Sequence, residues 1–284
     1  FYVNQNLLNN TFFFTKNKKL LLKENFFKQP FEVIFRTFSE SIKLIGKRYY
    51  AVRGKKFNNW RVSGSLLQAI RLYSLREVDE LIFLDIGATK NKNINFKLID
   101  EFADECFMPI TVGGGIKSLD DIEELYKVGA DRVCVNTQAF QDPVFIQDAI
   151  KTFGTQSIVV SVDYKKINSK FFVFICSGSI NTNIELKEYL KKLNDTGVKE
   201  VMLTSMDHDG MMNGYDLKNI SYANLNYDFR VIASGGAGNK RDVLDLILSS
   251  KIDALSCSSI FHFTEITPLS LKKYLSENNI NTRI

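Results

Sequence analysis

The stretch Val78-Asp79-Glu80-Leu81-Ile82-Phe83-Leu84 recurs about 120 residues later as Val198-Lys199-Glu200-Val201-Met202-Leu203-Thr204. Two glycine-rich segments keep nearly the same offset, Thr111-Val112-Gly113-Gly114-Gly115 and Ile232-Ala233-Ser234-Gly235-Gly236. Such a period is too long for a solenoid repeat, so each copy is expected to hold several strand and helix units. Two halves of this kind predict a closed barrel.

Short apolar runs alternate with amphipathic stretches, a pattern typical of parallel strands linked by helices. Eight runs are candidate strands: 40–45, 80–85, 109–113, 132–136, 157–163, 200–205, 230–234 and 253–258. The amphipathic stretches 119–128 and 186–196 are candidate helices, and Ser118 is placed to cap the first of them. The expected fold is α/β, a (β/α)8 TIM barrel built from two half-barrel repeats.

Composition sets the domain plan and excludes several classes of protein. Residues 1–30 differ from the rest and are expected to form a poorly ordered N-terminal extension, with the barrel over residues 31–284. No apolar run reaches the roughly 20 residues of a membrane helix, so we expect no membrane contact, and the scattered cysteines indicate a reducing, cytoplasmic compartment. The net charge of +5 suits a small anionic ligand better than a nucleic acid. The four cysteines form no CxxC pair, and two histidines are too few for a metal cluster, so no cofactor is expected.

Residues that directly follow the strands should line the mouth of such a barrel. Glycines there let backbone N–H groups approach a phosphate, and nearby amides and hydroxyls add hydrogen-bond donors. The alternative is that the glycines only form tight turns between strands and helices. The duplication favours two phosphate sites that face each other and a ligand with a phosphate at each end. The candidate residues are Gly114, Gly115, Asn136, Thr137, Ser234, Gly235, Gly236, Ser258 and Ser259.

Longer motifs stand at the same strand ends. They are Asp79–Ile86, Thr111–Ile116, Leu203–Gly210, Asn213–Asp216, Ala233–Gly238 and Phe261–Phe263. Together they resemble the cyclase subunit (HisF) of imidazole glycerol phosphate synthase, from about residue 50 to the C-terminus. The resemblance implies a heterodimer with a glutaminase subunit (HisH-like), whose ammonia passes through the barrel. It also implies ring closure on a bisphosphate substrate, which gives imidazole glycerol phosphate and AICAR in histidine biosynthesis. Thr204, Asp209 and Gly210 fall at substrate-binding positions.

The resemblance further implies two catalytic aspartates, at the ends of the first and fifth strands, that act as general acid and base. Asp163 matches the fifth-strand member. No aspartate occurs from residue 1 to residue 78. Counting without gaps places Ile45 at the first-strand position, whereas the internal repeat indicates residues 41–43; Glu40 is the nearest acid. Met211 also replaces a threonine of the family pattern.

Charged residues at the other end of the barrel form an ammonia gate in this family. Glu80 and Glu200 match two of them, and Arg132 replaces a lysine. The alternative is that both glutamates are solvated residues at the starts of strands.

The remaining polar candidates have structural alternatives. Asp85, Asp207 and Asp209 could bind substrate or cap helices and loops, and Asp209 is the best candidate for a substrate role. His262 lies between two phenylalanines and is expected to pack rather than act as a ligand. The adjacent pair Trp60-Arg61 falls in the loop after the first strand, which is an active-site loop in the family or an ordinary surface turn.

Three functions remain open. The first is the cyclase of histidine biosynthesis. The second is a cyclase-like paralogue that lacks the first-strand aspartate and supports glutamine-dependent amidation of a surface-polysaccharide sugar; Phe57–Arg61 and Glu105–Pro109 resemble that branch (WbuZ-like). The third is a phosphate-sugar binding barrel without catalysis.

Overall fold

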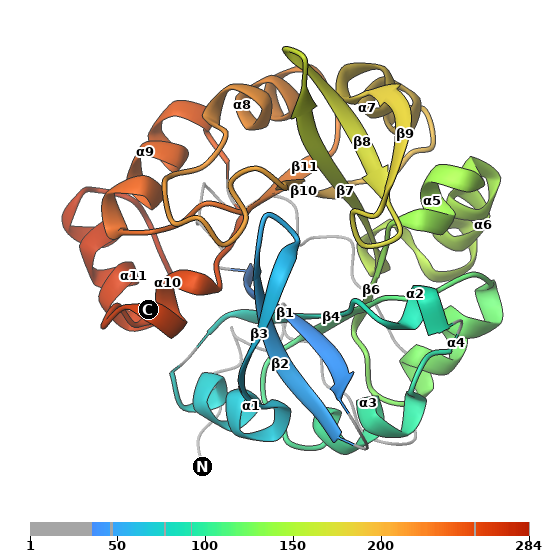
Figure 1. The fold of residues 1–284 in the computed structure, drawn as a ribbon, viewed down its shortest axis with the longest axis horizontal. Coiled ribbons are helices and arrows are strands. Elements are labelled where there is room, and N and C mark those ends of the chain that lie inside the picture. The colour runs from blue at the N-terminus through green and yellow to red at the C-terminus, as the bar shows by residue number, and fades with distance from the viewer. Residues whose placement is uncertain (1–35, 46–47, 77, 92, 253, 284) are drawn as a thin grey trace, which may run out of the picture.

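The computed structural model describes residues 36–45, 48–76, 78–91, 93–252 and 254–283, and the extension expected at residues 1–30 lies outside them. Within this part of the chain, parallel strands curl into a barrel surrounded by helices (Figure 1). The sheet closes because β1 lies against β12. The barrel strands follow one another in the order β1 (Arg36–Ile45), β4 (Glu80–Asp85), β5 (Ile110–Gly113), β6 (Arg132–Val135), β7 (Ile158–Ile167), β10 (Glu200–Ser205), β11 (Arg230–Ser234) and β12 (Ala254–Ser256).

Helices follow the strands and cover the outside of the barrel (Figure 1). Ser118 caps α4 as predicted, because its side chain accepts from the N–H of Asp121 while the Asp121 carboxylate accepts from the N–H of Ser118. The helices are α1 (Leu66–Leu75), α2 (Ala88–Asn91), α3 (Phe96–Ala103), α4 (Leu119–Lys127), α5 (Thr137–Gln141), α6 (Pro143–Phe153), α7 (Leu186–Asn194), α8 (Leu217–Asn226), α9 (Lys240–Ser250), α10 (Ser259–Phe263) and α11 (Pro268–Glu277). The predicted (β/α)8 barrel is confirmed.

Each half of the barrel begins with the same unit, a long strand, an antiparallel hairpin and a helix. In the first half, β1 is followed by β2 (Arg48–Lys55), β3 (Asn58–Ser65) and α1. In the second half, β7 is followed by β8 (Lys170–Ile175), β9 (Ile180–Glu185) and α7. The duplication therefore includes the hairpin and the helix that follow the first strand of each half.

The strand register identifies which residue of β1 corresponds to Asp163. Asp163 pairs with Thr204 on β10, and Ser41 pairs with Leu84 on β4. Because Leu84 and Thr204 are equivalent in the repeat, Ser41 is the counterpart of Asp163. The gapless count to Ile45 is wrong, since Ile45 lies further along β1, opposite Arg48 of β2.

The interior of the barrel is filled below its mouth. One buried side chain from each of six strands forms this layer: Ile82, Cys134, Val159, Met202, Ile232 and Ala254. The alternate residues of the strands point outward and pack against the helices in a second, larger cluster. Below the cavity, the described side chains of these six strands therefore form a packed layer.

Candidate active site at the barrel mouth

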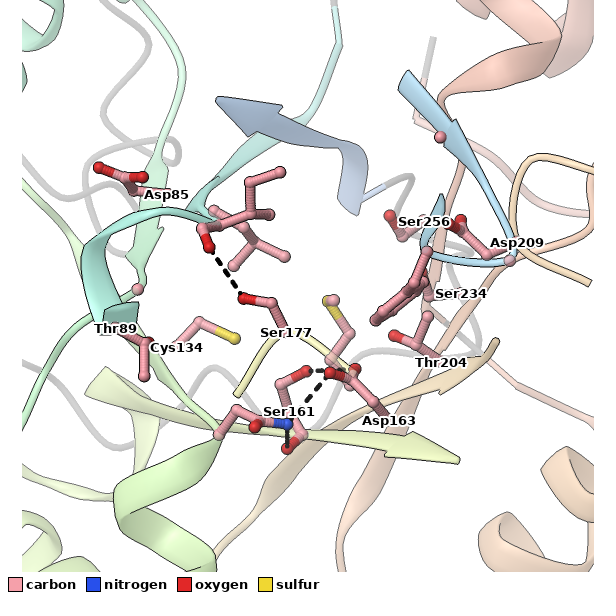
Figure 2. Close-up of a pocket in the computed structure, with 18 of the residues that line it drawn as sticks. Asp85, Thr89, Cys134, Ser161, Asp163, Ser177, Thr204, Asp209, Ser234 and Ser256 are labelled. Carbon is pink, nitrogen blue, oxygen red and sulfur yellow. Dashed lines mark hydrogen bonds between the residues drawn. The ribbon is translucent and has the colours of Figure 1, made fainter. Parts of the chain in front are cut away.

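A cavity of about 510 Å3 opens at the C-terminal ends of the strands. Figure 2 shows polar side chains from several strands around it, among them Asp163, Thr204, Asp209 and Ser234. Every residue predicted for catalysis, phosphate binding or substrate binding lines this cavity: Gly114, Gly115, Asn136, Thr137, Asp163, Thr204, Asp209, Gly210, Ser234, Gly235, Gly236, Ser258 and Ser259. The structure therefore brings all of them together.

Asp163 is buried on β7 at the floor of the cavity, with 7% of its surface exposed. Ser161 Oγ donates to its Oδ1 at 3.3 Å, and Asn136 Nδ2 donates to its Oδ2 at 3.3 Å. Burial raises the pKa of Asp163 to about 7, an effect that Ser161 opposes and the charge of Asp209 strengthens. A carboxyl group with this pKa can accept or release a proton near neutral pH.

Asp209 is a second carboxyl group in the same cavity and follows β10 in the chain. Burial raises its pKa to about 6, while the positive charge of Arg53 opposes the rise. Its backbone also holds the β2–β3 hairpin, because its carbonyl oxygen accepts from the N–H of Lys56 at 2.9 Å. Asp209 therefore lines the cavity with its carboxyl group and holds the β2–β3 hairpin with its backbone.

The two halves of the cavity floor differ in polarity. In the second half, Thr204, Ser234 and Ser256 lie in adjacent register beside Asp163 and line the cavity. The equivalent positions of the first half are Leu84, Gly113 and Cys134. Two cavity hydroxyls, Thr204 Oγ1 and Ser258 Oγ, are buried and make no hydrogen bond within the described residues. Buried hydroxyls of this kind are suited to a polar ligand, since a buried polar group without a partner is costly.

The glycine-rich loops have a structural requirement of their own. Gly114 has φ of +108°, and a Cβ there would lie 2.3 Å from the carbonyl oxygen of Asp85. Gly236 has φ of +122°, and its Cβ would lie 2.1 Å from the carbonyl oxygen of Gly214. The turns thus need glycine with or without a ligand, and the glycines alone do not identify a phosphate site.

Two short helices begin at the cavity, directly after the predicted donors. Asn136 precedes α5 and Ser258 precedes α10, and neither side chain caps its helix. The first N–H groups of a helix carry a partial positive charge and bind anions readily. Their positions at the ends of β6 and β12 give the cavity two places that suit a phosphate.

Two hairpins cover the cavity. Phe57 at the tip of β2–β3 packs on Gly178 of the β8–β9 turn, where a Cβ would lie 2.6 Å from the phenylalanine ring. Trp60 lines the cavity, whereas Arg61 is exposed and does not. The predicted active-site loop is therefore a hairpin, and only the first residue of the pair faces the cavity.

Sequence reasoning missed Arg53, which lines the cavity with only 6% of its surface exposed. Its Nη1 donates to the Val52 carbonyl oxygen, and its Nη2 lies 2.7 Å from His262 Nε2. His262 also meets the ring of Tyr73 edge-on, with centroids 6.0 Å apart. The packing role predicted for His262 is therefore incomplete, because it also hydrogen-bonds a cavity residue. The sequence carried no local signal for this contact, which joins residues 209 positions apart.

The other polar candidates make hydrogen bonds within the loops. Asp85 lines the cavity and accepts the N–H groups of Gly87 and Ala88, whereas Asp207 does not line it and accepts the N–H of Lys166 at 2.8 Å. Met211 is partly exposed and does not line the cavity. His208 Nδ1 lies 2.8 Å from Ser205 Oγ.

A charged cluster lies at the opposite end of the barrel, where the strands begin. Arg132 Nη1 is 2.8 Å from Glu200 Oε2 and 3.7 Å from Glu80 Oε2. The side chains of Glu80 and Glu200 are only 11% and 6% exposed, so the solvated alternative is wrong for both. The three residues of the predicted gate therefore form one buried cluster.

Three further observations concern metal ligands, membrane helices and cysteines. No group of three or more potential metal ligands occurs among the described residues. No helix in the described ranges is long and apolar enough to span a membrane. Cys106, Cys134, Cys176 and Cys257 are free thiols, and burial raises the pKa of Cys134 and Cys257 to about 12.

Comparison with known proteins finds a family model for histidine biosynthesis proteins that matches residues 44–267. The imidazole glycerol phosphate synthase subunit HisF of Natranaerobius thermophilus is 38% identical over 234 residues, covering 82% of this chain and 93% of that protein. The subunit of the same name from a Hydrogenobaculum species is 38% identical, with the same coverage of both chains. The one from a Thermotoga species is 38% identical and is covered over 92% of its length.

Proposed function

The chain belongs to the histidine biosynthesis protein family, and we propose that it is a cyclase subunit that uses ammonia to close an imidazole ring. The substrate carries a phosphate at each end, and a glutaminase partner supplies the ammonia. The observation that carries the proposal is the position of Asp163. It is buried on the cavity floor between two loops that suit phosphate groups.

The cavity suits an elongated bisphosphate. Its volume of about 510 Å3 lies within the range of small-molecule sites. One pair of anion-binding positions follows β5 and β6, and the other follows β11 and β12. A ligand held at both ends would place its middle over Asp163, where the Thr204 hydroxyl is available.

Asp163 would transfer protons during ring closure. Because the pKa of its carboxyl is about 7, both protonation states are populated near neutral pH. The ionised form can take a proton from the attacking ammonia nitrogen, and the protonated form can return one to the oxygen that leaves as water. Ser161 and Asn136 hold the carboxyl group in place through both states.

The face where the strands begin supports a protein partner. Leu75 ends α1 and is 82% exposed, and Phe107 precedes β5 and is 90% exposed. Arg71 and Glu105 form an ion pair of 2.9 Å between the same two segments. Exposed large apolar side chains near a buried charged cluster fit a docking face for the glutaminase, with Glu80, Arg132 and Glu200 at the entry of ammonia.

A second candidate function rests on Ser41. The register makes it the counterpart of Asp163, so β1 supplies no aspartate at the position of the second acid. In a cyclase-like paralogue, the barrel would receive ammonia from the glutaminase and deliver it for amidation of a surface-polysaccharide sugar. The buried cluster of Glu80, Arg132 and Glu200 fits this function as well, because ammonia would still have to enter the barrel. A barrel that only binds a phosphate sugar would not need such a cluster.

The test supplies ammonia directly. Purified protein is incubated with the bisphosphate cyclase substrate and excess ammonium salt at alkaline pH, and the imidazole product is followed by mass spectrometry. Product from the wild type and from the exposed control Asp228→Asn, but not from Asp163→Asn, supports the cyclase. Binding of the substrate without product supports ammonia delivery to another acceptor. Absence of binding contradicts both functions.

A further inference from the structure

Arg53 is a cationic side chain that lines the cavity, and a contact with a distant part of the chain fixes its position. It stands on β2, and its guanidinium is held by the Val52 carbonyl oxygen and by His262 of α10. His262 lies one helical turn after Ser258, the cavity residue that precedes α10. The guanidinium is therefore held on the side of the cavity formed by β11 and β12.

The contact between Arg53 and His262 has a fixed direction. A guanidinium has only N–H donors and stays charged, so its Nη2 donates and His262 Nε2 accepts at 2.7 Å. The Tyr73 hydroxyl lies 2.5 Å from the same nitrogen and shares it as a donor. An acceptor nitrogen requires the neutral imidazole, with its proton on Nδ1. His262 is thus held by α1 and in turn holds Arg53.

Polar groups that line the same cavity as Arg53 fit the recognition of a dianion. Ser258 Oγ is buried without a hydrogen bond in the described residues, and Ser259 begins α10 at the same wall. A guanidinium binds phosphate oxygens with two parallel donors, but only when its plane is fixed. The Asp209 carboxyl is close enough for Arg53 to act on it electrostatically, so an incoming phosphate would share this cation with Asp209.

We infer that Arg53 is the cationic ligand of the phosphate site at β11 and β12, and that His262 is the residue that positions it. The inference rests on the proposed function, because it assigns side chains to one end of the proposed bisphosphate substrate. His262 does not line the cavity and acts through Arg53. The hairpin that covers the cavity is thereby linked to α10 through a side chain that would bind the ligand.

Calorimetric titration with the bisphosphate cyclase substrate, in the absence of ammonia, tests this inference. Arg53→Ala should lower the affinity by about tenfold to a hundredfold, as expected for loss of a charged hydrogen-bonding partner. His262→Ala should lower it by about tenfold, and His262→Gln should restore most of the loss because the glutamine oxygen can accept from Arg53. Tyr73→Phe should have a smaller effect than His262→Ala.

A double-mutant cycle separates positioning from a merely structural role. In the Arg53→Ala background, His262→Ala should cause no further loss of affinity. Equal losses in both backgrounds would show that His262 acts independently of Arg53 and would overturn the inference. Unchanged affinity in Arg53→Ala, together with weaker binding in Ser258→Ala, would remove Arg53 from the site and leave the proposed function intact. If the wild type does not bind the substrate, the inference and the proposed function both fail.

Loss of the fold is checked separately from the affinity measurements. Each variant is first checked by thermal unfolding, since His262 packs against Tyr73. If His262→Ala does not fold, His262→Gln and its matched isostere His262→Leu give the same comparison between an accepting and a non-accepting side chain. Equal affinity of these two variants would contradict the positioning role.

Discussion

Replacing Asp163 with asparagine should stabilise the fold at alkaline pH. The pKa of this carboxyl is raised from 3.8 to about 7, chiefly because it is buried. The folded chain therefore binds more protons than the unfolded chain between these two values. The contribution of Asp163 to stability is fully present below about pH 4 and is lost as the pH rises through about 7, because the buried group must then ionise. Asparagine keeps the shape of the side chain and has no charge to bury.

The size of the effect follows from the difference between the two pKa values. About three pH units at about 1.36 kcal/mol each give about 4 kcal/mol between low and high pH. The Asn136 amide reduces this gain. It donates to Asp163 Oδ2 at 3.3 Å, and in the variant it would face the NH2 group of the introduced asparagine. One disturbed hydrogen bond costs about 1 kcal/mol. At about pH 8 the variant should therefore exceed the wild type by about 3 kcal/mol in free energy of unfolding.

Urea denaturation at a series of pH values, followed by circular dichroism, measures this difference. The wild type should lose stability relative to Asp163→Asn as the pH rises from about 4 to about 8. The control Asp228→Asn removes an exposed carboxylate and should stay within about 0.5 kcal/mol of the wild type. A difference between the wild type and Asp163→Asn that does not change with pH would refute the assignment of a raised pKa to Asp163.

Three further perturbations test the cover, the gate and the closure of the barrel. Gly210→Ala should destabilise the fold by at least about 2 kcal/mol, because φ is +68° and the new Cβ would lie 2.0 Å from the Gly54 carbonyl oxygen. In the control Gly197→Ala, φ is +83° with no atom within 4 Å, so thermal unfolding should show only the conformational cost of about 1 kcal/mol. Glu200→Gln should reduce turnover driven by glutamine and the glutaminase more than turnover driven by ammonium salt; equal loss in the two assays would place Glu200 outside the ammonia route. Lys272→Met should cost about 3 kcal/mol in urea denaturation, because Asp79 loses a buried ion pair of 2.9 Å, whereas the exposed Lys127→Met should cost under about 1 kcal/mol.

The barrel could be predicted from the sequence because both halves repeat the same strand and loop signals. Glu80 and Glu200 begin matching strands, and Gly114 and Gly235 follow matching strands. Once the fold is a barrel, residues after its strands must gather at one end. That rule places Asp163 and both glycine loops around one cavity without any knowledge of side-chain contacts.

The position on β1 equivalent to Asp163 followed from the internal repeat, which indicated residues 41–43 and so included Ser41, but not from the gapless count to Ile45. The pairing of β1 with β4 is specified by hydrogen bonds between strands distant in the sequence, and it shifts between Arg36 and Ser39. A gapless count back from Phe57 assumes the family spacing between β1 and the hairpin, and it arrives at Ile45, four residues beyond Ser41. The contact between Arg53 and His262 could not be predicted from the sequence, because side chains from β2 and α10 meet only in the folded barrel.

The two halves of the barrel differ in the polarity of the residues at the cavity floor, and this difference determines where proton transfer could take place. Asp163, Thr204 and Ser234 lie side by side in the second half, whereas the first half has Ser41 and Leu84 at the equivalent positions. Proton transfer would therefore take place on one wall of the cavity. A single carboxyl group can serve as acceptor and then as donor if its pKa is near the working pH, and the pKa of Asp163 is about 7. The burial that destabilises ionised Asp163 is thus the same property that would let it perform both steps without a partner on β1.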